Sequence, residues 1–253
     1  MPEPAVLFES DTRIAVVTLN RPSVYNAITF DSLAALADIC SELESEPPRA
    51  VILTGAAPGF CSGIDLKESR EANSDFAKRR ATLMHSVLHR LRNLPSPLIA
   101  AIDGVAAGLG CELAISGDLR IASPSSRFSY PEPKVAVPSP TFHLSRLIGV
   151  ARTQDMLLTA RWIDVSEAYA WGLVTRVADD PFAAAKQLAG ELMELSPISL
   201  TRTKENLAIA ISGGEQAATT HHIEHVAAAA GTRDRVEALA AFAEKRPPRF
   251  EGR

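Results

Sequence analysis

The sequence lacks several features that mark other classes of protein. Its net charge is −4, and its basic residues are scattered apart from residues 78–80 and the C-terminal tail, so nucleic acid is not an expected partner. No apolar run approaches the roughly 20 residues that cross a bilayer, and a membrane partner is not expected either. The first residues lack the pattern of a signal or transit peptide. We therefore expect a cytoplasmic protein.

Cysteine and histidine give little support for a disulfide or a metal site. The three cysteines, Cys40, Cys61 and Cys111, have no CxxC spacing, which favours small buried side chains. His221 and His225 stand at i and i+4 on a predicted helix, but the H-E-x-x-H order and a third ligand are missing. The sequence therefore predicts no metal site.

Three other histidines leave alternatives open. His85 and His89 also stand four residues apart, on a predicted helix where they could shape a substrate site or simply lie on the helix surface. His143 falls in a segment that follows Glu132, and a polar side chain there could lie near an acid. The surface is the expected place for such side chains.

The chain can bury a large core, since it has 253 residues of which 46% are hydrophobic. A strand pattern at 13–19 is followed by Thr29, a plausible cap for a helix whose leucine and isoleucine residues recur at helical spacing from 33 to 43. From about Gly149 the pattern is mostly helical, with helices expected at 151–159, 166–171, 181–195 and 198–211 and a final pair in 213–253. The pattern predicts an α/β protein with a helical C-terminal part.

Two glycine-rich turns follow predicted buried strands. In the first, the strand 98–103 leads through Gly104, Gly108 and Gly110 into a helix start, where free backbone N–H groups can stabilise an oxyanion. The glycine order fits neither a dinucleotide fingerprint nor a phosphate loop. In the second, the strand 49–55 leads into a turn in which Gly59 and Gly63 let the backbone approach a ligand.

Two glutamates accompany these turns. Glu112 comes directly after the first turn, and Glu132 lies twenty residues further on, after Phe-Ser-Tyr-Pro. Each alone would be expected on the surface. Together they suggest acid–base chemistry by a carboxylate pair whose pKa values are set by burial and by each other.

Seven segments, in order along nearly the whole chain, resemble the enoyl-CoA hydratase/isomerase, or crotonase, superfamily. They are 19–27 (Leu-Asn-Arg-Pro-Ser-Val-Tyr-Asn-Ala), 59–67 (Gly-Phe-Cys-Ser-Gly-Ile-Asp-Leu-Lys), 102–114 (Ile-Asp-Gly-Val-Ala-Ala-Gly-Leu-Gly-Cys-Glu-Leu-Ala), 118–123 (Asp-Leu-Arg-Ile-Ala-Ser), 128–132 (Phe-Ser-Tyr-Pro-Glu), 171–174 (Trp-Gly-Leu-Val) and 241–250 (Ala-Phe-Ala-Glu-Lys-Arg-Pro-Pro-Arg-Phe). The resemblance implies a crotonase-like spiral of ββα units as a catalytic core over 1–195. It also implies a helical trimerisation region over 196–253, which would form a homotrimer or a dimer of trimers.

The resemblance implies hydration of a 2-enoyl-CoA, as in fatty acid β-oxidation. The backbone N–H groups of Ile64 and Leu109 would form the oxyanion hole for the thioester carbonyl, and Glu112 and Glu132 would be the acid–base residues. No cofactor is implied, because coenzyme A is part of the acyl-CoA substrate. The residues that the resemblance implies for coenzyme A binding are Arg21, Asp65, Leu66, Lys67, Phe242 and Lys245, the last two often from a neighbouring subunit.

The chain departs from the family pattern in two places. Leu109 stands where glycine is usual, and a leucine with positive φ there would cost roughly 1–2 kcal/mol. The segment after Glu132 lacks the usual Pro-Gly-x-Gly-Gly-Thr-Gln. Double-bond isomerisation and non-catalytic acyl-CoA binding therefore stay open beside hydration.

Overall fold

The computed structural model describes residues 3–11, 13–70, 73–140 and 142–253. Its strands are β1 (Val6–Ser10), β2 (Ile14–Leu19), β3 (Ala50–Gly55), β4 (Leu98–Ile102), β5 (Val105–Ala107), β6 (Leu119–Ala122), β7 (Arg127–Ser129), β8 (Ile163–Asp164) and β9 (Arg176–Val177). Its α-helices are α1 (Phe30–Ser45), α2 (Leu66–Arg70), α3 (Ser74–Arg92), α4 (Leu109–Ile115), α5 (Phe142–Ile148), α6 (Val150–Thr159), α7 (Val165–Trp171), α8 (Pro181–Met193), α9 (Pro197–Ala230) and α10 (Arg233–Glu244). Two 3-10 helices, η1 (Pro22–Val24) and η2 (Glu132–Val135), complete the set.

The main sheet has six strands in the order β1-β2-β3-β4-β6-β9, and all neighbours are parallel except β1 and β2. A second sheet of three short strands has the order β5-β7-β8. Each of β4 and β6 passes directly into a strand of the second sheet, β5 and β7, and β5 then leads into α4. This repetition of strand, strand and helix confirms the predicted crotonase-like spiral.

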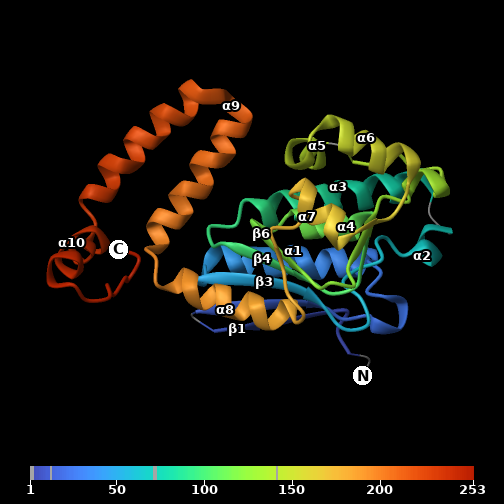
Figure 1. The fold of residues 1–253 in the computed structure, drawn as a ribbon. Helices are drawn as coiled ribbons and strands as arrows, with labels where there is room; N and C mark the ends of the chain where they lie inside the picture. Colours follow the sequence, from blue (N-terminus) through green and yellow to red (C-terminus); the bar gives the residue numbers. More distant parts are fainter. Residues whose placement is uncertain (1–2, 12, 71–72, 141) are drawn as a thin grey trace.

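The main sheet separates two apolar layers. On β3, Val51 and Leu53 pack into the larger core with α1 and α3, while Ala50 and Ile52 face α8 on the other side. The alternation follows from the two-residue period of a strand, and a sheet covered on both faces needs apolar residues at every position. Figure 1 shows α8 on one face of the sheet and α1 and α3 on the other.

The structure confirms the predicted start of α1 and moves the predicted end of α8 by two residues. Thr29 caps α1 by accepting a hydrogen bond from the Ser32 amide at 3.2 Å, as expected for threonine before a helix. The helix predicted to end at 195 ends at Met193, where Glu194 is its C-cap.

The C-terminal helices form an arm beside the core (Figure 1). Within α9, Gly214 is non-helical, so the element is two helices joined at a kink, where the predicted pattern also changes. The first half meets the core through polar contacts, including an ion pair of 2.6 Å between Lys204 and Asp118. The arm exposes large apolar side chains, namely Leu207, Ile211, Ile223, Val226, Val236, Leu239 and Phe242. In the described part of the chain, no helix combines the length and the hydropathy that a bilayer crossing requires.

Candidate active site

The two glycine-rich turns lie against each other because Cys61, within the second turn, pairs with β5. The Cys61 amide donates to the Val105 carbonyl at 2.9 Å, and the Ala107 amide donates to the Cys61 carbonyl at 2.9 Å. The adjoining backbone is close-packed at Gly63, whose φ is +97° and where a Cβ would stand 2.7 Å from the Ala107 carbonyl oxygen. The same Cβ would lie 3.6 Å from the Leu109 nitrogen. Glycine is required there by both φ and space.

The amides of Ile64 and Leu109 have no hydrogen-bond acceptor among the residues that the structure describes. Leu109 is the first residue of α4, and the first-turn N–H groups of a helix have no intrahelical acceptor. Around Ile64, the Gly63 carbonyl and the Asp65 amide pair with Ile28, at 2.8 and 2.9 Å, and the Ile64 amide takes no part. Two free donors therefore lie on adjoining backbone segments, at the positive end of a helix.

Leu109 is not strained. The positive φ of this turn falls one residue earlier, at Gly108, with φ +52° and ψ −117°, and Leu109 is absent from the residues with positive φ. The leucine side chain is 4% exposed and packs in the core. The cost considered for a leucine at positive φ therefore does not arise.

Glu112 lies on α4, a helix in which all seven residues are buried. Its side chain is 3% exposed, and its Oε1 accepts a hydrogen bond of 2.8 Å from the Tyr130 hydroxyl. Burial raises the pKa of Glu112, while the Tyr130 hydrogen bond and the charge of Arg92 act in the opposite direction and the charge of Glu132 adds to the rise. The surface alternative for Glu112 is therefore wrong.

Glu132 begins η2 and brings its carboxylate to the start of α4. A Cβ on Gly108 would stand 2.6 Å from Glu132 Oε1, so this oxygen lies directly over the residue before the helix. Burial raises the pKa of Glu132, opposed by a hydrogen bond to its carboxylate from its own backbone amide and by the Ser139 hydroxyl, which lies 3.4 Å from Oε2. The two glutamates thus meet where the free Leu109 amide begins α4.

A cluster of positively charged or protonatable groups lies on the α3 side of Glu112. Arg92, in the last turn of α3, is half-buried, and its guanidinium lies 3.5 Å from the Ser116 hydroxyl. Burial lowers the pKa of Arg92, and the negative charge of Glu112 opposes this. Burial, with the charges of Arg92 and Arg146, lowers the pKa of His143 to about 4. His85 and His89 are exposed on α3, as expected for a helix surface.

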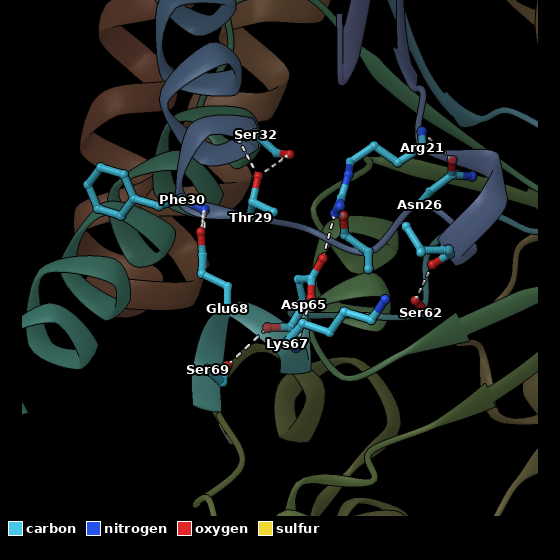
Figure 2. A network of polar contacts seen from close by, with 12 residues as sticks. Arg21, Asn26, Thr29, Phe30, Ser32, Ser62, Asp65, Lys67, Glu68 and Ser69 are labelled. Atoms are coloured by element: carbon cyan, nitrogen blue, oxygen red, sulfur yellow. Dashed lines mark hydrogen bonds and ion pairs between the residues drawn. The ribbon is translucent and has the colours of Figure 1, made fainter. Parts of the chain in front are cut away.

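Four of the predicted coenzyme A residues lie around the Ile64 turn, and Figure 2 shows three of them, Arg21, Asp65 and Lys67, close together. Arg21 donates to Asp65 at 2.9 Å and to the Ala27 carbonyl at 2.6 Å. Burial opposes ionisation of Asp65, but hydrogen bonds from Arg21 and from the Lys67 and Glu68 amides outweigh it and lower the pKa of Asp65. The Lys67 and Leu66 side chains are exposed. In this chain Arg21 and Asp65 therefore brace the turn that carries Ile64.

Phe242 and Lys245 lie elsewhere in the chain. Both are exposed, Phe242 at 87%, and Figure 1 shows α10 at the far end of the arm from α4. The structure does not bring them to the turns of their own chain.

Three residues of this region have no role in the sequence-based prediction. Tyr130 lay within a recognised motif, and a buried tyrosine needs a hydrogen-bond partner, but the sequence does not show which. The Asn26 side chain donates to the carbonyls of Ala56, Gly59 and Phe60, at 2.8, 2.6 and 3.1 Å, and so holds the turn before Cys61. Arg92 gave no sequence signal, because its place depends on how the end of α3 lies against the end of α4 in the folded chain.

The fold first defines the class, since a spiral of strand, strand and helix with a helical C-terminal arm is the crotonase fold. The family model for enoyl-CoA hydratase/isomerase matches residues 9–253. A short-chain-enoyl-CoA hydratase of Clostridium acetobutylicum is 34% identical over 95% of both chains. The mitochondrial methylglutaconyl-CoA hydratase of Mus musculus is 35% identical over 97% of this chain and 82% of its own. The crystal structure of an enoyl-CoA hydratase from Bacillus anthracis superposes with a TM-score of 0.95 at 31% identity, covering 99% of this chain and 100% of that one.

The chain therefore belongs to the enoyl-CoA hydratase/isomerase, or crotonase, superfamily. The relatives' names support a hydratase or a related crotonase-type enzyme.

Proposed function

We propose that the protein is an enoyl-CoA hydratase, which adds water across the double bond of a 2-enoyl-CoA. The observation that carries this proposal is that the buried Glu112 and the half-buried Glu132 come together on α4 and over its start, beside the free amide of Leu109. A reaction that takes a proton from water and gives one to carbon uses one group as base and one as acid, and the two glutamates can fill these roles. The negative charge on the enolate oxygen is stabilised by the two backbone amides.

In the proposed mechanism the thioester oxygen accepts hydrogen bonds from the Ile64 and Leu109 amides. Glu112, whose carboxylate accepts the Tyr130 hydrogen bond, takes a proton from water as the water oxygen bonds to the β-carbon. The electrons of the double bond move onto the thioester, and its oxygen becomes the enolate held by the two amides. Glu132, whose pKa is raised by burial, then delivers its proton to the α-carbon as the enolate collapses.

Hydration is tested with crotonyl-CoA by the loss of absorbance of the conjugated thioester. We expect wild-type turnover, and loss of turnover with retained binding in Glu112→Gln and Glu132→Gln, since glutamine keeps the shape but neither accepts nor gives the proton. Glu9→Gln on the exposed end of β1 is the matched control and should keep wild-type activity. Binding of crotonyl-CoA without turnover by the wild type would favour an acyl-CoA-binding protein. Conversion of a 3-enoyl-CoA to the conjugated thioester without hydration would favour isomerisation.

We propose a homotrimer, or a dimer of trimers, as the working assembly. The apolar side chains that the arm leaves exposed support this, because such surface is usually covered by a partner. Phe242 and Lys245 then reach the coenzyme A moiety bound at the Arg21 and Lys67 turn of a neighbouring subunit. Light scattering measures the assembly, and a monomer at micromolar concentration would contradict it.

Sharing of the site between subunits has its own test. Glu112→Gln and Phe242→Ala chains are each expected to be weak alone, but a mixed assembly contains sites with Glu112 from one chain and Phe242 from the other. With random one-to-one assembly about a quarter of the sites are intact, so co-expression should restore about a quarter of wild-type activity. No recovery would contradict the contribution of α10 to a neighbouring site.

A second candidate substrate is an enoyl-CoA whose acyl group carries a carboxylate. The half-buried Arg92 lies beside Glu112, and its guanidinium takes part in none of the ion pairs among the described residues. The substrate in the name of the mouse relative, methylglutaconyl-CoA, bears a free carboxylate of this kind. Arg92→Met should lower kcat/KM for methylglutaconyl-CoA more than for crotonyl-CoA; an equal effect on both would contradict this specificity.

A further inference from the structure

Tyr130 is fully buried and approaches Glu112 from a different element. It follows β7, in the second sheet, while Glu112 lies on α4. The phenol has no exposed surface, and its hydroxyl donates to Glu112 Oε1 at 2.8 Å. Two residues after Tyr130 the same segment carries Glu132, so one stretch of backbone holds both a hydrogen-bond donor to the first acid and the second acid itself.

The two oxygens of Glu112 have different surroundings. Tyr130 is the one hydrogen-bond donor to this carboxylate among the described residues. Glu112 Oε2 receives no hydrogen bond in the same set, yet it is not among the fully buried polar atoms left without a partner, so it retains accessible surface. Oε1 is thus anchored, and Oε2 is free to meet a water molecule.

The other charged or titratable groups near Glu112 do not provide this anchor. Arg92, from α3, acts through its charge and directs its guanidinium to the Ser116 hydroxyl. Glu132, from η2, repels the carboxylate. Cys111, beside Glu112 on α4, directs its thiol to the Ala106 carbonyl at 3.0 Å.

Burial makes the Tyr130 hydroxyl the donor in its hydrogen bond with Glu112. It raises the pKa of Tyr130 well above the usual value, so the phenol stays neutral and keeps its proton to donate. A donor held against a carboxylate favours the ionised form of that carboxylate.

We propose that Tyr130 is a positioning residue that fixes Glu112 through Oε1, so that Oε2 faces the reacting water. This role rests on the proposed hydratase function. The tyrosine touches neither substrate nor water and acts only through Glu112.

The test is Tyr130→Phe, which removes one hydroxyl and keeps the ring. With crotonyl-CoA we expect kcat to fall about 10- to 100-fold and KM to stay within about twofold. The acid limb of the kcat/KM profile should move to higher pH by about one unit, because loss of the donor raises the pKa of Glu112. Tyr169→Phe, at an exposed tyrosine of α7, is the matched control and should leave both kcat and the profile unchanged.

The outcomes separate the two levels of the proposal. Absence of wild-type hydration would overturn the hydratase function itself. Wild-type hydration with an unshifted acid limb in folded Tyr130→Phe would overturn the positioning role, since a purely structural tyrosine changes the amount of folded enzyme but not the profile.

A second measurement covers the case in which Tyr130→Phe does not fold. The chain has 3 tyrosines, so Tyr25→Phe/Tyr169→Phe leaves Tyr130 alone to be replaced by 3-fluorotyrosine in the growth medium. The more acidic phenol is a stronger donor, and the acid limb should move to lower pH. An unchanged limb in this protein would refute the role of Tyr130.

Discussion

The contact between Gly108 and Glu132 predicts a specific effect of one added methyl group. In Gly108→Ala the new Cβ would stand 2.6 Å from Glu132 Oε1, whereas ordinary contact begins at 3.4 Å. The carboxylate is the free end of a side chain, so it moves rather than the backbone, by about 0.8 Å.

The magnitude follows from two separate costs. Misplacing a catalytic group by about 1 Å costs about 100-fold in rate, so we expect kcat/KM for crotonyl-CoA to fall by about that factor. The backbone angles of Gly108, with φ +52° and ψ −117°, are unfavourable for alanine and lower the free energy of unfolding by about 1–3 kcal/mol.

Gly172→Ala separates the two costs. Gly172 ends α7 with φ +81°, and a Cβ there would meet nothing within 4 Å. This control should lose stability without losing turnover per folded enzyme, measured by thermal unfolding and by the crotonyl-CoA assay on the same samples. Wild-type turnover in folded Gly108→Ala would refute the placement of Glu132 over the start of α4.

Three other measurements test the buried groups. Burial raises the pKa of Glu112 in the folded protein, so the native state loses stability as the pH rises through that raised pKa. Glu112→Gln should therefore melt at a higher temperature than the wild type at pH 8, and this gain should vanish below the ordinary glutamate pKa of about 4.3. An equal gain in melting temperature at all pH values would contradict this expectation. Asn26→Ala leaves three turn carbonyls without their donor, so the free energy of unfolding, measured with denaturant, should fall by roughly 3 kcal/mol. A decrease below about 1 kcal/mol would contradict the role of Asn26 in holding the turn. Burial raises the pKa of Cys40 to about 11 and of Cys61 to about 12, and it raises the pKa of Cys111 well above the usual value. A thiol reagent should therefore react with all 3 cysteines only after the protein unfolds. Rapid labelling of the native protein would contradict their burial.

Local signals in the sequence predict the parts of this structure that depend on local chemistry. Thr29 gives its helix cap, the glycines give the turns, and the apolar runs give strands buried on both faces. The closeness of Glu112 and Glu132 is not local, since it requires that β7 pair with β5 and carry Glu132 back to Gly108. Motifs along the whole chain indicated that arrangement through the family, where spacing alone could not.

Other contacts depend on packing that no motif records. Arg92 reaches Ser116 because the last turn of α3 lies beside the C-terminal end of α4, and Tyr130 reaches Glu112 because the chain that leaves β7 passes next to α4. The family motif places the expected positive φ at Leu109, whereas in the structure the residue with positive φ is Gly108. A one-residue difference of this kind is decided by how the helix starts, which sequence patterns locate only to within a few residues.

The division of the site between α4 and η2 has a consequence for how this enzyme could change its reaction. A backbone donor and Glu112 belong to one fully buried helix, whereas Glu132 belongs to a short segment whose following residues, 133–138, are exposed. In the proposed mechanism, substitutions in or next to that exposed segment would move or remove the second acid at little cost in stability, while the backbone donors proposed to polarise the thioester stay in place. A change of reaction in such a site would therefore destabilise the fold less when it comes from substitutions at η2 than when it comes from substitutions on α4.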